Sequence, residues 1–136
     1  MDKLQVIELL EAMQQFEKKL NLALMYSGLR IPQFRVMVFL EKSGKITVSD
    51  LSRYMNVTRA TMSVLVNQLL SAGVIESNKN IKDKRSFYVT LTESGMRRLE
   101  LAQREVLLVE EKISLAFDAG TILSLNQFSK ELLSKS

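Results

Sequence analysis

The segment from residue 47 to residue 92 constrains the fold of this chain most, because it joins two short helical patterns through a very tight turn. Thr47 is placed to cap the first helix, with Asp50 three residues on as its capping-box partner, and Thr58 is placed to cap the second. Between them, Asn56 tolerates the left-handed backbone that a helix needs in order to stop and turn sharply. This order of residues predicts a helix-turn-helix.

The second helix of this motif is predicted to be amphipathic and to end at Gly73, which suits a left-handed C-cap. Its apolar positions recur at helical spacing and form the predicted buried stripe: Met62, Leu65, Val66 and Leu69. The opposite face is the one that a tight turn presents to a major groove, where arginine suits guanine, asparagine suits adenine and small apolar groups touch thymine methyls. The candidate DNA-binding residues on this helix are therefore Thr58, Arg59, Ala60, Ser63, Val64 and Asn67.

A strand, a basic loop and a second strand follow the helix pair. Val74 and Ile75 open the first strand, and apolar residues alternate from Phe87 to Leu91 in the second. The loop between them, residues 78–85, holds four cations and one anion. The cations suit phosphates and a narrow A/T-rich minor groove, and they are Lys79, Lys82, Lys84 and Arg85. The pattern predicts a β-wing attached to the helix-turn-helix.

Together these motifs resemble the multiple-antibiotic-resistance regulator (MarR) family of winged-helix transcription factors. The resembling segments are residues 31–36, 48–52, 61, 69, 72–75, 83–86 and 91–95. The most specific part is an Asp-x-Arg signature in the wing, joined to Leu-Thr-Glu-x-Gly after it. The resemblance implies an obligate homodimer that binds pseudo-palindromic duplex DNA and often releases it when a small molecule binds.

The resemblance also implies the roles of further residues. In the wing, Asp83 would brace Arg85, and the arginine would meet the minor groove or its phosphates. A pocket for a small-molecule effector would lie between the dimer helices and the winged unit. Its expected wall residues are Met25, Tyr26, Arg30 and Phe34.

Long helical patterns flank the winged segment. Apolar residues recur every three or four positions across residues 2–26, and Thr92 is placed to cap a helix that runs to about Asp118. Ser124 is predicted to cap a last helix. These apolar faces exceed what one small winged unit can cover, which favours a homodimer.

The expected fold class is mainly α, an α+β winged helix-turn-helix with long N- and C-terminal dimerisation helices. A single MarR-like domain is expected over residues 1–136. Residues 30–95 would form its winged helix-turn-helix, DNA-binding part, and residues 1–29 and 96–136 its helical dimerisation part. A short strand at residues 46–47 would lie beside the wing.

Composition narrows the classes of function. The chain has no cysteine and no histidine, so it lacks disulfides, Cys/His metal sites and the Ser-His and Cys-His pairs of nucleophilic catalysis. We therefore expect no enzyme activity, no metal and no cofactor, although counting alone leaves a carboxylate-based enzyme open. No apolar run of transmembrane length occurs, so no membrane partner is expected and the expected location is the cytoplasm.

The placement of charge points to a polyanionic partner. The net charge of the chain is +4, and residues 30–95 alone carry ten Lys/Arg against five Asp/Glu. An excess of positive charge in the winged segment indicates a phosphate-binding surface, with double-stranded DNA as the partner.

Two functions stay open on the sequence. The first is a dimeric DNA-binding transcription regulator that can respond to a small-molecule effector. The alternative is a MarR-like protein-interaction module that has lost operator binding and regulates another transcription factor. The sparse charge of the second helix motivates it, because Arg59 is the only cation between Thr58 and Gly73. Lys82 stands where the family commonly has an acidic residue, so positive charge has moved from the helix to the wing.

Overall fold

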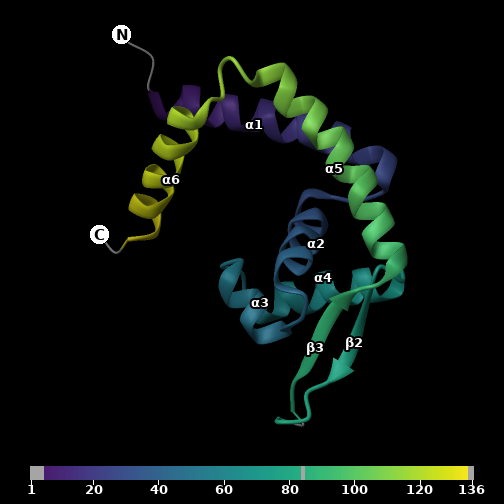
Figure 1. The fold of residues 1–136 in the computed structure, drawn as a ribbon. Coiled ribbons are helices and arrows are strands. Elements are labelled where there is room, and N and C mark those ends of the chain that lie inside the picture. Colours follow the sequence, from purple (N-terminus) through teal and green to yellow (C-terminus); the bar gives the residue numbers. More distant parts are fainter. Residues whose placement is uncertain (1–4, 84, 135–136) are drawn as a thin grey trace.

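The computed structural model describes residues 5–83 and 85–134, which form a helical body and a small three-stranded sheet (Figure 1). Along the chain the elements are α1 (Gln5–Leu24), the 3-10 helix η1 (Met25–Ser27), α2 (Ile31–Ser43), β1 (Ile46–Thr47), α3 (Val48–Tyr54), α4 (Arg59–Ser71), β2 (Ile75–Lys79), β3 (Phe87–Leu91), α5 (Glu93–Ile113) and α6 (Ala119–Leu133). The predicted fold class is confirmed, since the molecule is mainly α with a winged helix between long terminal helices.

The predicted helix-turn-helix is formed by α3 and α4. Thr47 Oγ1 accepts a hydrogen bond from the Asp50 amide at 3.1 Å and so caps α3. Thr58 Oγ1 caps α4 in the same way, through the Thr61 amide at 3.1 Å. Asn56 makes the turn between the helices with a left-handed φ of 55°. Both predicted caps and the turn are therefore confirmed.

The three strands form an antiparallel sheet in the order β1-β3-β2. The short strand β1 lies where the sequence predicted it and pairs with β3, Ile46 opposite Val89. β2 and β3 make the wing hairpin, in which Lys79 and Phe87 are the last paired residues before the tip. Figure 1 shows this hairpin extending from the helical body, away from α1.

One hydrophobic core joins the winged unit to both flanking helices. Its largest fully buried side chains are Leu24, Met37, Leu40, Leu51, Met62, Leu69, Leu99, Val36, Val74 and Val89. Leu24 comes from α1 and Leu99 from α5, so the flanking helices share this core with the winged unit. On α4 the predicted stripe is buried at Met62, Val66 and Leu69, whereas Leu65 is half-buried.

The end of α4, the start of β2 and the start of α5 meet at a hydrogen-bonded junction. Thr92 Oγ1 donates to the Gly73 carbonyl at 2.8 Å and accepts from the Gly95 amide at 3.0 Å. The Thr92 amide donates to the Val74 carbonyl at 3.1 Å. A Cβ at Gly95 would collide with that same carbonyl oxygen, so only glycine lets α5 approach this closely. The Leu-Thr-Glu-x-Gly signature thus fastens α5 to the winged unit.

Two predicted features at the C-terminal end are wrong. α5 ends at Ile113 rather than near Asp118, and residues 114–117 form a turn. Asp118 itself caps α6, because its carboxylate accepts a hydrogen bond from the Thr121 amide at 2.9 Å. Ser124, the predicted cap, lies inside α6.

The first helix is also shorter than the predicted span of residues 2–26. α1 covers Gln5–Leu24, and the chain then tightens into the 3-10 helix η1 before Gly28 turns it with a left-handed φ of 71°. Residues 2–4 lie outside the described residues.

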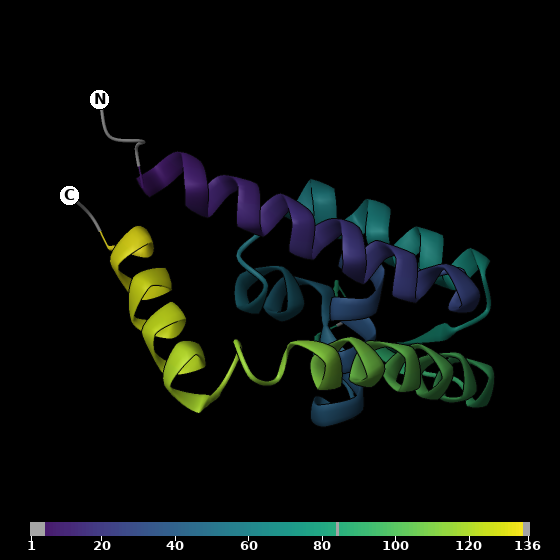
Figure 2. The same cartoon turned by 90° about the horizontal axis from the view of Figure 1, so that it is seen from above.

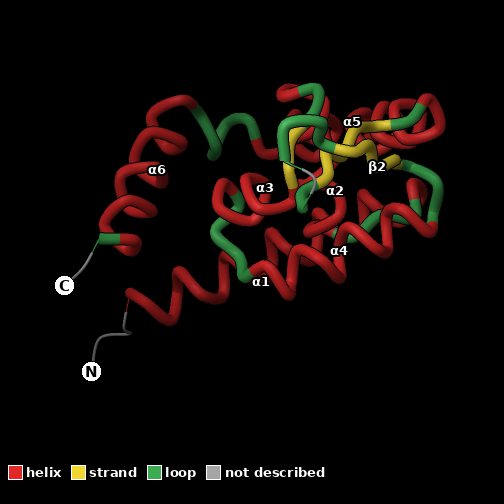
Figure 3. The backbone as a smooth tube through the Cα atoms, turned by 90° about the horizontal axis from the view of Figure 1, so that it is seen from below, coloured by secondary structure: helices red, strands yellow, loops and turns green. Residues whose placement is uncertain are grey.

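The terminal helices expose much apolar surface. α6 buries none of its residues and stands apart at one end of the molecule, while α1 and α5 run along the winged unit (Figures 1, 2 and 3). The exposed large apolar side chains of α1 and α6 are Val6, Ile7, Leu10, Met13, Phe16, Leu22, Ile122, Leu123, Leu125, Phe128, Leu132 and Leu133. Within the described part of the chain, none of the helices is long and apolar enough to cross a membrane.

We expect Gly95→Ala to lower the free energy of unfolding by about 1–3 kcal/mol, because the added methyl group overpacks the junction with Val74. Chemical denaturation followed by circular dichroism measures this change. Gly120→Ala is the matched control, since a Cβ there meets only the Asp118 carboxylate, at 3.4 Å. Equal destabilisation by both variants would contradict the role given to Gly95.

The α6 cap makes a prediction about pH. Hydrogen bonds from the Thr121 amide and hydroxyl hold the pKa of Asp118 below its ordinary value. Because the folded pKa is depressed, the cap stabilises α6 above the unfolded pKa, and this stabilisation is lost as the pH falls through the folded value. Far-ultraviolet circular dichroism should show less helix for Asp118→Ala at neutral pH and no change for Ser124→Ala. Asp118→Asn should keep the helix and lose its acid dependence; an unchanged acid transition in that variant would disprove the assignment.

Candidate nucleic-acid interface

α4 presents to solvent the face that the sequence assigned to DNA. The predicted contact residues of this helix are all exposed: Thr58, Arg59, Ala60, Ser63, Val64 and Asn67. Val64 is 56% exposed, although a side chain of its type is usually buried. Since the opposite stripe of α4 packs into the core, this face is fixed in its orientation and free of contacts with the core.

A pair of glutamines also holds α4 from outside the core. Gln33 Nε2 on α2 donates to Gln68 Oε1 on α4 at 3.0 Å. Gln33 Oε1 in turn accepts from the Arg30 amide at 3.0 Å, which closes the first turn of α2. The bridge therefore ties the position of α4 to the start of α2. No local pattern signals this contact, because the two glutamines lie 35 residues apart.

The wing holds its described cations in solvent. Lys79, Lys82 and Arg85 are exposed, and the Arg85 side chain is 93% exposed. Asp83 Oδ1 accepts from the Arg85 amide at 3.0 Å and lies 3.5 Å from Arg85 Nε. Asp83 therefore makes a short hydrogen bond to the Arg85 backbone and only a long, solvent-exposed ion pair with the Arg85 side chain. Lys84, the fourth predicted cation, lies outside the described residues.

Asn80 and Ser86 hold the tip of the wing together. Asn80 Nδ2 donates to Ser86 Oγ at 2.9 Å, and Asn80 Oδ1 accepts from the Lys82 amide at 3.0 Å. A third hydrogen bond joins the Asn80 amide to the Ser86 carbonyl at 3.3 Å. Asn80 is buried, at 9% exposure, although it lies in the wing loop. The sequence signal that could have found it is an asparagine at the start of a polar turn, where its side chain replaces a backbone acceptor.

The exposed face of α4 and the wing meet around one hollow. It measures about 250 Å³, and its lining includes Ser63 and Asn67 from α4 with Ser77 and Phe87 from the wing. Lys45 precedes β1, and its Nζ lies 4.9 Å from the centre of the Tyr88 ring on β3. The helix and the wing therefore form one continuous surface rather than two separate ones.

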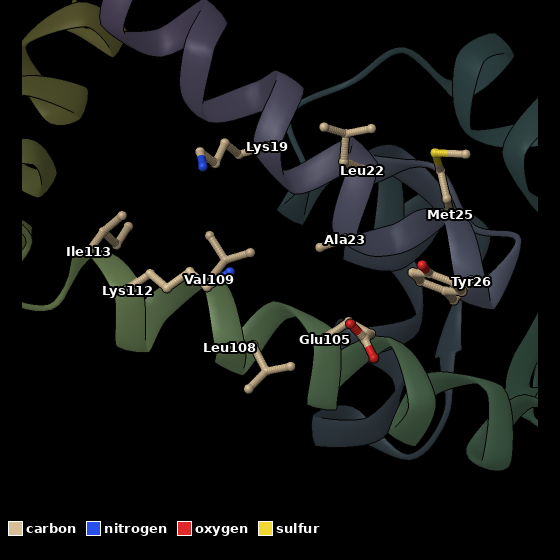
Figure 4. A pocket seen from close by; sticks show the side chains of 10 residues that line it. All are labelled: Lys19, Leu22, Ala23, Met25, Tyr26, Glu105, Leu108, Val109, Lys112 and Ile113. Atoms are coloured by element: carbon tan, nitrogen blue, oxygen red, sulfur yellow. The ribbon is translucent and has the colours of Figure 1, made fainter.

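The structure brings together two of the four predicted pocket residues. Met25 and Tyr26 line an open hollow of about 560 Å³ between α1 and α5 (Figure 4). Phe34 lines a different hollow of about 280 Å³, and Arg30 is exposed at the N-cap of α2. The sequence did not indicate the rest of the wall of the larger hollow, which comes from α1 (Lys19, Leu22 and Ala23) and from α5 (Glu105, Leu108, Val109, Lys112 and Ile113). Among the described residues, no group of three or more His, Cys, Asp or Glu side chains could hold a metal ion.

A capped helix pair followed by a basic two-stranded hairpin on a three-stranded sheet defines a winged helix-turn-helix protein. A model of the MarR family matches residues 27–86, from the end of η1 to the wing. The resemblance to the MarR family predicted from the sequence is confirmed over these residues.

Individual relatives and solved structures are similar to this chain in the same way. The HTH-type transcriptional repressor YetL of Bacillus subtilis is 28% identical over 100 residues, which are 69% of this chain and 60% of that protein. The match thus spans about three-fifths of that relative's length. The structure of a mutant of E. coli MarR complexed with operator DNA has a TM-score of 0.81, with 22% identity, and covers 96% of this chain and 95% of that chain. The structure of NadR in complex with 4-hydroxyphenylacetate has a TM-score of 0.76, with 21% identity, and covers 99% and 96%.

Proposed function

We propose that the protein is a dimeric, DNA-binding transcription regulator that recognises pseudo-palindromic duplex DNA. The observation that carries this proposal is the continuous surface of α4 and the wing, whose side chains line one hollow. On a duplex, α4 would enter the major groove while the wing reaches an adjacent minor groove. The likeness of the fold to MarR in complex with operator DNA supports this mode of binding.

The two parts of the surface would do different work. α4 offers few groups for reading bases, chiefly Arg59 and Asn67, with Val64 available to thymine methyls. The wing offers an exposed Arg85 together with lysines, which suit phosphates and a narrow minor groove. Binding would therefore depend strongly on salt and discriminate modestly between sequences.

A second copy of the chain is the partner that best covers the apolar surface of the terminal helices. α6 buries none of its residues, yet Leu132 and Leu133 expose 69% and 66% of their surface. On α1, Met13 is 57% exposed and Phe16 44%. Contiguous apolar surface of this kind marks an association site in soluble proteins. A two-fold pairing would also provide the paired α4 helices that a pseudo-palindrome requires.

The hollow between α1 and α5 is the place where an effector would act in this proposal. Met25 and Leu108 supply apolar wall and Tyr26 a phenol, while the positive charges of Lys19 and Lys112 outnumber the one carboxylate, Glu105. Such a lining suits a small apolar or aromatic anion. The complex of NadR with 4-hydroxyphenylacetate, on the same fold, supports a ligand of this class.

The alternative is a MarR-like interaction module that has lost operator binding and regulates another transcription factor. It rests on the single cation of the α4 face, Arg59. Binding of the protein to duplex from the region upstream of its own gene separates the two functions, and the salt experiment below provides that measurement.

Leu132→Asp is expected to convert the protein to monomers, because it places a charge in the apolar surface that the second copy covers. Analytical ultracentrifugation at micromolar concentration measures the change. Val64→Asp is the matched control, since Val64 is equally apolar and 56% exposed but lies on the face assigned to DNA. A wild-type chain that sediments as a folded monomer would exclude the dimer.

Lys82→Ala and Arg59→Ala are expected to affect DNA binding in different ways. Lys82→Ala should lower the slope of log affinity against log salt by about 0.9 and weaken all duplexes alike, since it removes a phosphate contact. Arg59→Ala should reduce the ratio between operator and random DNA with little change in slope. Fluorescence anisotropy over a range of salt concentrations measures both.

The control for the salt experiment is Lys18→Ala, an exposed cation on α1 far along the chain from the wing, which should change neither quantity. If Arg59→Ala flattened the slope and Lys82→Ala altered base preference, the two roles would be reversed. If the wild type bound no duplex above its affinity for random DNA, the interaction module would be the better reading.

A further inference from the structure

The wing loop carries one apolar side chain that the proposed function does not use. Ile81 is 94% exposed, and among the large apolar residues described only Leu115, in the turn after α5, is more so. Scattered apolar side chains on a surface are ordinary. Ile81 differs because it lies in the loop of the wing, between the exposed Lys79 and Lys82 in sequence.

The loop presents Ile81 without using its side chain. Asn80 Oδ1 accepts from the Lys82 amide at 3.0 Å, so the asparagine closes a turn around Ile81. The same side chain ties this turn to the other arm of the hairpin through Ser86 Oγ at 2.9 Å. The Ser86 amide in turn donates to the Asp83 carbonyl at 3.1 Å. The isoleucine is therefore held out in solvent by its neighbours, and replacing it should leave the wing intact.

We propose that Ile81 is an apolar minor-groove contact, buried against deoxyribose and base edges when the wing docks. This inference rests on the proposed DNA binding and adds to it a residue and a kind of contact. Charge complementarity selects the occupant, because Lys79, Lys82 and Arg85 are exposed on the same hairpin and require a polyanion beside the apolar group. Duplex DNA satisfies both needs, since apolar side chains contact and wedge into its minor groove between rows of phosphates. A second copy fits this part of the molecule poorly, because the surface proposed for it lies on α1 and α6 and the wing extends away from α1 (Figure 1).

Such a contact has two measurable properties that a lysine contact lacks. It releases no counterion, so its share of the affinity does not change with salt. It also needs an unobstructed groove floor, and the 2-amino group of guanine protrudes there while A·T pairs carry no such group. Ile81 would thus give the wing a preference for A·T over G·C that does not depend on the sparse reading face of α4.

The test measures binding of the full chain to a duplex from upstream of its own gene, by fluorescence anisotropy over a range of salt concentrations. Ile81→Ala is expected to weaken binding roughly tenfold, as for partial burial of the lost carbons, with the salt slope unchanged. Ile81→Leu keeps the apolar volume and is expected to stay within about threefold of the wild type. Lys82→Ala, by contrast, should lower the slope by about 0.9.

A second readout replaces guanine by inosine at the positions that the wing covers, which removes the 2-amino group and keeps the major-groove edge. The wild type should gain affinity on this replacement, and Ile81→Ala should gain much less. A general loss of stability cannot produce that difference. Equal binding by Ile81→Ala and the wild type, or an equal gain with inosine, would overturn the inference and leave the proposed function standing.

Two other outcomes would also overturn it. Failure of the wild type to bind any duplex would remove the proposed function and this inference together. A change in sedimentation of Ile81→Ala in the absence of DNA would show that a second copy covers the side chain instead.

Discussion

The junction around Thr92 is the contact on which the rest of the structure depends. The hydroxyl of Thr92 accepts a hydrogen bond from the Gly95 amide of α5 and donates one to the Gly73 carbonyl just after α4. The end of α4 and the start of α5 are therefore joined by hydrogen bonds of about 3 Å rather than by a flexible linker. In the proposed dimer, the separation of the two α4 helices would be set by α5 through this junction, and half-site spacing on DNA would follow from it.

The parts of the fold that the sequence predicted well are those whose causes are local. The caps at Thr47 and Thr58 need only a hydroxyl and an amide three residues away, and Asn56 needs only its own tolerance of a left-handed turn. The stripe on α4 follows from helical periodicity alone. Asp50 was predicted to be the capping-box partner of Thr47, but its carboxylate instead forms an ion pair with Arg53 at 2.6 Å.

The failures have equally specific causes. Asp118 and Ser124 are both suitable N-cap residues. Because glycine disfavours a helix, the Ala-Gly pair after Asp118 led to the wrong prediction that the helix begins at Ser124, although Gly120 lies inside α6. The bridge from Gln33 to Gln68 joins residues far apart in sequence, so no periodicity contains it. Residues predicted to line one pocket lie in two separate hollows, which sequence spacing does not reveal. Met25 and Tyr26 line the hollow beside α5, whereas Phe34 lines the hollow beside α3. The packing of one helix against another determines which residues line a pocket, and sequence spacing alone does not.

The wing shows how a mostly solvated loop can still be prepared for binding. Asp83 gives one carboxylate oxygen to the Arg85 amide at 3.0 Å and only a distant contact to Arg85 Nε, so it fixes the backbone and leaves the guanidinium 93% exposed. Asn80 does the same on the other arm, where its side chain fixes the Lys82 amide and the ammonium group stays in solvent. The shorter hydrogen bonds of both side chains thus go to backbone amides and to Ser86 Oγ, and only the longer 3.5 Å contact of Asp83 goes to a cation. These hydrogen bonds fix the backbone around Lys82 and Arg85 in the free protein, which would reduce the conformational entropy lost in the proposed binding. The described cations of the wing stay exposed, so a chain with one arginine on the exposed face of α4 still presents positive charge beside that helix.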